Sequence, residues 1–207
     1  MRIKLLFVIL FFSVVGWGQV TIVSDGLNNS SSLFTLSGGA FYTGNSAAGD
    51  RSASSPFAIE GTHGYGLTSG TATLTSSSFS TCGHSSVTMS LRLAAFSIGS
   101  TTNGLDSGDV VTIEVSPDDG ANWYSTLRIL GNSNAFWGYS GTGVASTSYD
   151  GNATPVDIQP AGGGSRTTDG YSTINITGLP SVSLLKIRIT LSDDSSERWV
   201  VDDFKVQ

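Results

Sequence analysis

The stretch RWVVDDFKV, residues 198–206, has the alternating composition of a β-strand near the end of the chain. Successive side chains of a strand point to opposite faces, so Val200, Asp202, Phe204 and Val206 are expected to share one face. That face is apolar except for Asp202. A carboxylate among core side chains is costly unless it is hydrogen-bonded, paired with a cation or bound to a metal. Asp202 therefore points to a specific site.

The same alternation recurs along the chain between clusters of Gly, Ser, Asn and Asp. The clearest apolar stripes run from Val87 to Leu93, from Val111 to Val115 and from Leu185 to Leu191. Shorter runs lie at 19–24, 33–36, 57–60, 72–75, 123–129, 135–140 and 174–176. About a dozen short strands without a helix-period segment predict an all-β fold, an antiparallel β-sandwich. A change of phase at Ala94-Ala95 predicts a β-bulge there.

The first 18 residues have the features of a secretory signal peptide. Arg2 and Lys4 precede an apolar run from Leu5 to Val15, and small residues follow before Gln19. The run is short for a membrane span, so no membrane insertion is expected after cleavage. The mature chain, 19–207, has the length of a single domain, and two polar segments within it, 37–55 and 152–170, are expected to be long loops. A secreted or cell-surface location follows.

Charge and cysteine content narrow the function classes. The chain has a formal net charge of -6, and removal of Arg2 and Lys4 brings it near -8. An acidic balance without a basic cluster argues against a nucleic-acid partner. Cys82 is the only cysteine, which excludes an intramolecular disulfide, and it is expected to be a small buried hydrophobe rather than a reactive thiol.

No catalytic constellation stands out. The chain has two histidines, His63 and His84, and neither a G-x-S-x-G elbow nor an H-E-x-x-H motif is present. Glu60, Glu114 and Glu197 cannot be paired for glycosidase chemistry from their positions alone. The sequence therefore predicts a protein that is not an enzyme, and a hydrolase with an unrecognised carboxylate site stays open as an alternative.

The segment SPDDGANW, residues 116–123, resembles an Asp-box hairpin, in which a serine, an aspartate and a glycine precede a tryptophan. Asp118 is expected to accept hydrogen bonds from the turn backbone, and Gly120 to adopt a positive φ. Turn chemistry accounts for each of these residues, so the motif is interpreted as structural.

Aromatic residues gather at 136–139, with Tyr149 nearby in sequence. Aromatic rings either pack into a core or offer a platform on which a sugar ring stacks. Alternation splits the group, so that Trp137 and Tyr139 share a face. We take Trp137, Tyr139 and Tyr149 as the candidate ligand-binding residues, with core packing as the alternative.

Calcium is the cofactor that the acidic residues favour, because it binds several carboxylate and carbonyl oxygens. Asp202 and Asp203 lie near the end of the chain, and Asp25 follows the first predicted strand. First and last strands of a sandwich are often adjacent, so these three aspartates are the predicted metal ligands, with Asp50 as a further candidate. The alternative is that each aspartate is hydrogen-bonded to loop backbone.

Three segments together carry a family resemblance: GDVVTIEVS at 108–116, the turn at 118–123 and the closing stretch 198–206. With them the chain resembles a MAM/LamG-like jelly-roll domain of secreted Bacteroidetes proteins, from about residue 25 to residue 206. The resemblance implies a non-catalytic adhesion or accessory role that recognises a glycan or a surface protein. It also implies a structural calcium ion at Asp202 or Asp203. The paired cysteines of animal MAM domains are absent from this sequence.

The sequence therefore predicts a secreted, non-catalytic binding or adhesion module whose partner is a glycan or a surface protein. Two alternatives stay open. One is a purely structural spacer domain of a larger exported enzyme, and the other is the exported hydrolase mentioned above.

Overall fold

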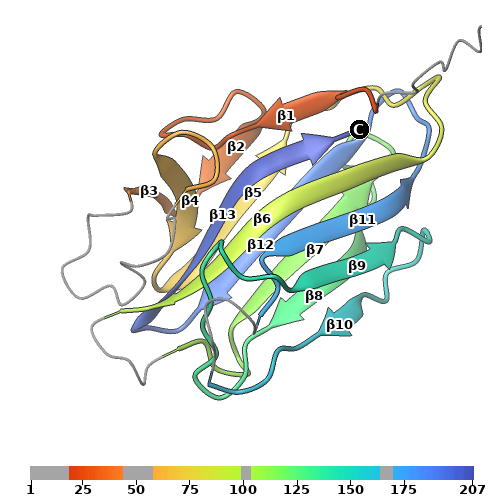
Figure 1. Cartoon of the computed structure of the whole chain (residues 1–207). Helices are drawn as coiled ribbons and strands as arrows, with labels where there is room; N and C mark the ends of the chain where they lie inside the picture. Colours follow the sequence, from red (N-terminus) through yellow and green to blue (C-terminus); the bar gives the residue numbers. More distant parts are fainter. Residues whose placement is uncertain (1–18, 44–57, 99–103, 164–169) are drawn as a thin grey trace, which may run out of the picture.

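The computed structural model describes residues 19–43, 58–98, 104–163 and 170–207, and within them it contains strands and no helix. Two sheets face each other (Figure 1). The seven-stranded sheet contains β1 (Val23–Asp25), β3 (Ala40–Thr43), β4 (His63–Leu67), β6 (Val87–Ser97), β9 (Val144–Ser148), β11 (Thr173–Leu179) and β13 (Glu197–Val206). The six-stranded sheet contains β2 (Phe34–Ser37), β5 (Gly70–Ser76), β7 (Val110–Ser116), β8 (Tyr124–Leu130), β10 (Val156–Ile158) and β12 (Lys186–Asp193).

The predicted all-β sandwich is confirmed, with 13 strands in the described residues. The strand orientation is mixed rather than antiparallel throughout, because β9 runs parallel to β11 and β10 runs parallel to β8. β3 and β10 fall within segments that were expected to be loops. Residues 58–60 and 135–140 are not strands, although Ala135 and Trp137 each form an isolated bridge.

The core lies between the two sheets and is built from the predicted stripes. Ile187, Ile189 and Leu191 of β12 are fully buried between β7 and β5, with which β12 pairs along most of its length. The first and last strands are adjacent, as predicted: β1 pairs antiparallel with β13, with Asp25 opposite Phe204 (Figure 1).

β13 does not keep a single alternation, so the predicted face of Val200, Asp202, Phe204 and Val206 is wrong. The pairing of β13 with β6 shifts between Asp202 and Lys205, where one extra residue enters β13. Asp203, within this bulge, has a φ of 49°. A bulge reverses which side chains point inward. Phe204 and Val206 therefore face the core, and Asp202 lies on the outward side with Val200.

β6 shows the opposite discrepancy: the bulge expected at Ala94-Ala95 is absent. The register against β13 is continuous from Glu197 opposite Ser97 to Asp202 opposite Arg92. Leu93 and Ala95 face the core between the sheets, whereas Ala94 belongs to a second apolar cluster on the outward face. Both faces are buried at this end of β6, which is why the alternation disappears from the sequence.

Some predictions lie outside the described residues, namely the signal peptide at 1–18 and Asp50. Across the described part of the chain, no helix has the length and apolar character needed to cross a membrane. Cys82, which was expected to be buried, is an exposed free thiol, because it lies on a turn between β5 and β6.

Candidate functional site

Asp202 lies where one edge of β13 changes partner, from β4 to β1. Its side chain is fully buried, and its carboxylate accepts hydrogen bonds from the backbone N–H groups of Ile59, Glu60 and Asp203. Burial raises the pKa of Asp202 to about 6, although the three N–H donors act in the opposite direction. The carboxylate fastens the segment before β4 to the last strand.

Asp25 does the same for the loop that follows β1. Its carboxylate accepts the N–H groups of Leu27, Ser32 and Leu33 at 2.9, 3.0 and 2.9 Å, and the hydroxyl of Ser31 at 2.7 Å. The loop from 26 to 33 therefore wraps around one buried carboxylate. Leu27 adopts a positive φ of 48° and is fully buried at the centre of this wrap.

Asp203 has a third kind of partner, since its Oδ1 lies 2.6 Å from Nζ of Lys205. The three aspartates predicted to bind calcium are thus engaged by N–H, O–H and ammonium donors. Backbone N–H donors, the alternative that the sequence left open, hold Asp25 and Asp202, whereas Asp203 pairs with the Lys205 side chain. Asp25, Asp202 and Asp203 do not come together as a group of facing carboxylates in the described residues.

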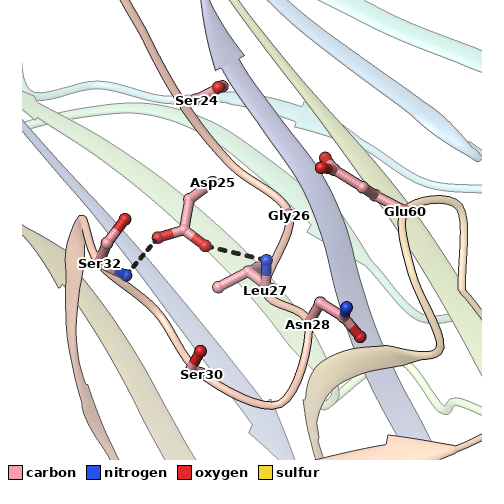
Figure 2. Close-up of a pocket in the computed structure, with 8 residues that line it drawn as sticks. All are labelled: Ser24, Asp25, Gly26, Leu27, Asn28, Ser30, Ser32 and Glu60. Carbon is pink, nitrogen blue, oxygen red and sulfur yellow. Dashed lines mark hydrogen bonds between the residues drawn. The ribbon is translucent and has the colours of Figure 1, made fainter.

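A polar pocket of about 260 Å³ lies between the loop after β1 and the segment fastened by Asp202 (Figure 2). It is lined by Ser24, Asp25, Gly26, Leu27, Asn28, Ser30, Ser32 and Glu60. Asn28 joins the two walls, because its Oδ1 accepts the N–H of Thr62 at 2.9 Å. The carboxylate of Glu60 lies over Gly26, so close that a side chain on Gly26 would overlap it. We call this the loop pocket.

The predicted ligand-binding aromatics lie elsewhere, and two of them are buried. Trp137 is 0% exposed, donates its indole N–H to the carbonyl of Leu93, and packs edge-to-face on Trp199 at 5.6 Å. Tyr139 is 1% exposed and packs on Phe96 in the outward cluster. Stacking on a sugar needs an exposed ring face, which neither residue offers. Core packing, the alternative, describes both.

Tyr149 is half-buried and packs edge-to-face with Tyr124 at 6.1 Å. It is far along the sheet order from the loop pocket, because it follows β9 at one edge of the seven-stranded sheet whereas β1 pairs beside β13. Tyr149 does not line the loop pocket.

The turn at 116–123 is built as the Asp-box resemblance predicts. Asp118 accepts the backbone N–H of Asn122 at 2.9 Å and the hydroxyl of Ser116 at 2.8 Å, and Gly120 has a φ of 88°. The hydrogen bond from the Asn122 side-chain amide, at 2.6 Å, and then those from the Asn122 N–H and the Ser116 hydroxyl lower the pKa of Asp118. The guanidinium of Arg188 lies over the Trp123 ring, 4.2 Å from its centroid. Turn chemistry and packing account for the motif.

Two of the three glutamates considered for hydrolysis, Glu60 and Glu114, are separated and have different partners. Glu114, on β7, pairs with Arg188 of the neighbouring β12 at 2.5 Å. Glu60 lines the loop pocket. Glu114 lies in the six-stranded sheet, whereas Glu60 precedes β4 of the seven-stranded sheet. The structure therefore does not bring them together as a pair of catalytic carboxylates.

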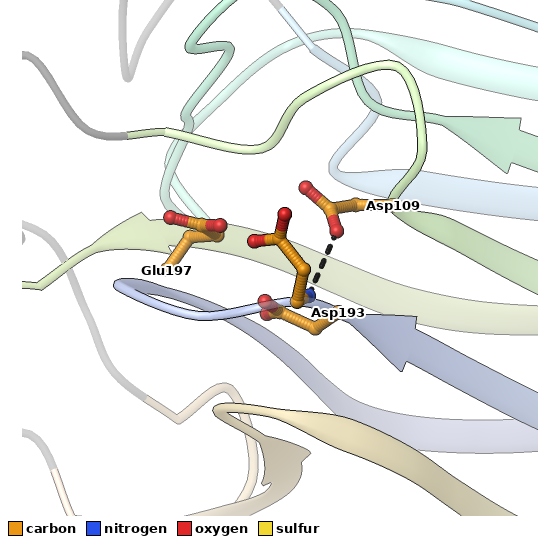
Figure 3. Close-up of side chains that lie close together, drawn as sticks. Asp109, Asp193 and Glu197 are labelled. Carbon is orange, nitrogen blue, oxygen red and sulfur yellow. Dashed lines mark hydrogen bonds between the residues drawn. The ribbon is translucent and has the colours of Figure 1, made fainter.

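A different group of acids meets at one end of the sandwich (Figure 3). Asp109 precedes β7, Asp193 ends β12, Asp194 follows it, and Glu197 begins β13. One oxygen from each lies within 4.8 Å of the others. Asp109, Asp193 and Glu197 are 2%, 4% and 4% exposed, whereas Asp194 is exposed. We call these four residues the acidic cluster, and a metal ion could be held there.

Electrostatics within the acidic cluster is unfavourable for ionised side chains. Burial, together with repulsion by Asp109 and Asp194, raises the pKa of Asp193 to about 8, against the attraction of Arg198. Burial and a hydrogen bond with the Asp194 carboxyl group raise the pKa of Glu197 to about 8. Within the described residues, both oxygens of Asp193 are buried without a hydrogen-bond partner.

The sequence carried a signal for the acidic cluster that was missed. Asp193 continues the inward parity of Ile187, Ile189 and Leu191, and Asp109 continues that of Val111, Ile113 and Val115. Glu197 continues the inward parity of Trp199 and Val201 on β13. Each is an acid at the end of an apolar stripe, which is the pattern that had been noticed only for Asp202.

No protein-family model and no curated protein matches this chain. Among solved structures, TmCBM61 in complex with β-1,4-galactotriose is 12% identical with a TM-score of 0.47, over 91% of this chain and 99% of that one. The K2 adhesin domain of Lys-gingipain is 9% identical with a TM-score of 0.49, over 89% and 97%. The K3 adhesin domain from Porphyromonas gingivalis w83 is 10% identical with a TM-score of 0.48, over 91% and 99%. These matches assign no ligand to this chain.

Proposed function

We propose that this chain is a non-catalytic module of an exported protein and binds a sugar unit of a glycan in the loop pocket. The observation that carries the proposal is the construction of that pocket. Two buried carboxylates, Asp25 and Asp202, hold its two walls, and the lining between them is polar. Specific ligand sites place a few polar groups precisely in a concave surface.

The chemistry of the lining suits a ligand rich in hydroxyl groups. Glu60 offers two acceptor oxygens, the amide of Asn28 offers N–H donors, and Ser24 and Ser30 offer hydroxyls that both donate and accept. None of the eight lining residues is aromatic. Recognition would therefore rest on hydrogen bonds rather than on ring stacking.

The size of the pocket suits one sugar ring. Its volume of about 260 Å³ is below the range of roughly 300–1,000 Å³ that drug-sized ligands occupy. A hexose has about 12 non-hydrogen atoms, and at roughly 0.3 kcal/mol per atom its binding reaches only about millimolar Kd. Useful adhesion would then require several copies of the module, or several sugar units, to act together.

Pre-organised walls favour this pocket over a second one. The second pocket, of about 350 Å³, is lined by Gln19, Val20, Gly83, His84, Ser85, Ser86 and Gln207. Its lining contains no aspartate or glutamate, whereas the walls of the loop pocket are held by the buried carboxylates of Asp25 and Asp202. A site whose walls are already fixed loses less entropy when it binds.

A multivalent glycan array tests the proposal. Protein displayed on beads should retain a subset of glycans, and Glu60→Gln and Asn28→Asp should each weaken that binding at least tenfold. Both substitutions keep the shape of the side chain and change its hydrogen-bonding groups. His84→Ala, in the second pocket, is the matched control and should bind like the wild type.

Three outcomes would contradict the proposal. If no glycan is retained, the structural spacer role becomes the better description. If His84→Ala loses binding and Glu60→Gln does not, the second pocket is the site. If the retained glycans are shortened during incubation, and Glu60→Gln stops this, the module is a hydrolase.

A further inference from the structure

The acidic cluster is separate from the loop pocket, and its residues come from three strand ends. Asp109 lies at the start of β7 and Asp193 at the end of β12 in the six-stranded sheet, whereas Glu197 starts β13 in the seven-stranded sheet. The connection from β12 to β13 is where the chain crosses from one sheet to the other. Figure 3 shows the three side chains directed toward a common space at this crossing.

The cluster lacks the donors that satisfy the other buried acids. Asp109 accepts the N–H groups of Asp106 at 2.6 Å and Asp194 at 3.1 Å. Asp193, by contrast, is 4% exposed, and both of its oxygens lack a hydrogen-bond partner within the described residues. An unpaired buried carboxylate is expensive, so a partner of opposite charge is expected at this point.

The nearby arginine does not fill that role. Arg198 attracts Asp193, but its Nε donates to Thr68 Oγ1 at 3.1 Å, and its guanidinium lies over the Tyr42 ring, 3.8 Å from the centroid. Arg198 does not hydrogen-bond Asp193, because both oxygens of that carboxylate are without a partner within the described residues. One positive charge would in any case leave most of four carboxylates uncompensated.

We propose that the acidic cluster binds a calcium ion that joins the two sheets at the crossing from β12 to β13, with Asp193 and Glu197 as its principal ligands. Calcium takes six to eight oxygen ligands at about 2.3–2.6 Å, so opposite ligands on its coordination sphere are about 4.8 Å apart. The cluster presents four carboxylate oxygens within that distance of one another. Among the described residues nothing occupies either oxygen of Asp193, so both can bind the ion.

The proposed ion differs from the one that the sequence predicted at Asp25, Asp202 and Asp203. Those carboxylates are already engaged by hydrogen bonds and by Lys205. The acidic cluster has the opposite character, since both oxygens of its buried Asp193 lack a donor among the described residues. The proposal is also independent of the glycan proposal, because the two sites share no residue.

Thermal unfolding of the chelator-treated protein, with and without calcium chloride, tests the proposal. A native-state ligand stabilises by linkage, so calcium at 100 times its Kd should raise Tm by about 5–10 °C. Asp193→Asn and Glu197→Gln should each remove at least 90% of this shift. Asp157→Asn, at an exposed acid paired with Arg128, is the control and should keep the full shift.

Terbium provides a second readout that does not depend on stability. Terbium ions replace calcium in oxygen sites, and Trp199 lies two residues from Glu197 on the same face of β13. Excitation of tryptophan should therefore produce terbium emission that calcium competes away. Asp193→Asn should lose this emission while it stays folded, since it replaces a buried carboxyl group that has no hydrogen-bond partner among the described residues by an amide of the same shape.

Three results would overturn the proposal. The acidic cluster is not a calcium site if the wild type shows no Tm shift, if Asp193→Asn keeps the shift, or if magnesium alone produces it. A shift that Glu60→Gln abolishes and Asp193→Asn retains would place the ion in the loop pocket instead. Glycan binding that persists after calcium removal leaves the glycan proposal intact, whichever way the calcium experiment falls.

Discussion

The backbone N–H of Glu60 donates a hydrogen bond to the carboxylate of Asp202 at 3.1 Å, across 142 residues of sequence. Ile59 donates to the same oxygen. One buried carboxylate of the last strand thus positions a wall of the loop pocket, and Asp25 positions the other wall. Asp25 and Asp202, two aspartates that the sequence singles out, therefore shape the loop pocket.

Removal of the Asp202 carboxylate should destabilise the protein. Asp202→Ala leaves the N–H groups of Ile59 and Glu60, which make part-buried hydrogen bonds, without their acceptor, and a donor left unsatisfied away from water costs about 1–3 kcal/mol. We expect a loss of about 2–4 kcal/mol in the free energy of unfolding, measured by urea denaturation. Asp157→Ala, at an exposed ion pair, serves as the control and should change little. Equal stability of the two variants would show that the Asp202 contacts do not hold the fold.

The raised pKa of Asp202 gives stability a distinctive pH dependence. Its pKa is about 6 in the folded protein because of burial, against about 3.9 in an unfolded chain. Between these values the folded state binds the extra proton, so this group's contribution is fully present below about pH 4 and is lost as pH rises to about 6. The slope for one proton is at most about 1.4 kcal/mol per pH unit.

Asp202→Asn isolates this contribution, because it replaces the titrating carboxyl group by an amide of similar shape that does not titrate. The difference in unfolding free energy between wild type and variant should change between pH 4 and pH 6. The wild type should become less stable relative to the variant as pH rises. A difference that is constant over this interval would mean that the pKa of Asp202 is ordinary in the folded state. Other acids with raised pKa values, such as Asp193 and Glu197, affect both proteins equally and cancel.

The fold was largely predictable from sequence because its stripes have clean period-two alternation. The stripes at 87–93, 111–115 and 185–191 became β6, β7 and β12, since one face of each is buried and the other is polar. The errors occur where that condition fails. The outward face of β6 is buried beyond Leu93, and β13 contains a bulge at Asp203, so alternation no longer reports which way a side chain points.

The site was less predictable, because burial and partnership depend on contacts between distant segments. The sequence marked Asp202 as unusual but did not identify its partners, Ile59 and Glu60. These residues follow a polar segment whose sequence does not alternate, so its position relative to the strands could not be predicted. Trp137 was selected as an aromatic on a strand, but it lies on an irregular segment whose indole enters the core. Asp193 continues the inward parity of β12 and was detectable from it, whereas parity failed at Asp202 because the bulge at Asp203 reverses the facing of β13.

The burial of Trp137 gives a direct test of its role. Trp137→Ala should cost about 3–5 kcal/mol, because it leaves a large cavity beside Trp199 and removes the hydrogen bond to Leu93. Urea denaturation checks the value, and Tyr149→Ala, at a half-buried ring, should cost less. If Trp137→Ala unfolds like the wild type and loses glycan binding, then Trp137 is a ligand platform and its burial is misassigned.

Gly26 offers a way to disturb the loop pocket without disturbing the fold. A Cβ at this position would lie 2.5 Å from the carboxyl carbon of Glu60, so the end of that side chain must move. Glu60 is exposed and its side chain is flexible, and Gly26 has no positive φ to strain. Gly26→Ala should therefore change the free energy of unfolding by less than about 1 kcal/mol.

The same substitution should weaken glycan binding at least fivefold, because it displaces the carboxylate that we propose as the main acceptor for sugar hydroxyls. Gly108→Ala is the matched control, since its Cβ would meet open space and its φ is not positive. Binding on the glycan array and urea denaturation are measured for both variants. A Gly26→Ala protein that binds glycans as well as Gly108→Ala does would show that Glu60 makes no contact with the sugar, and the proposed site in the loop pocket would then be abandoned.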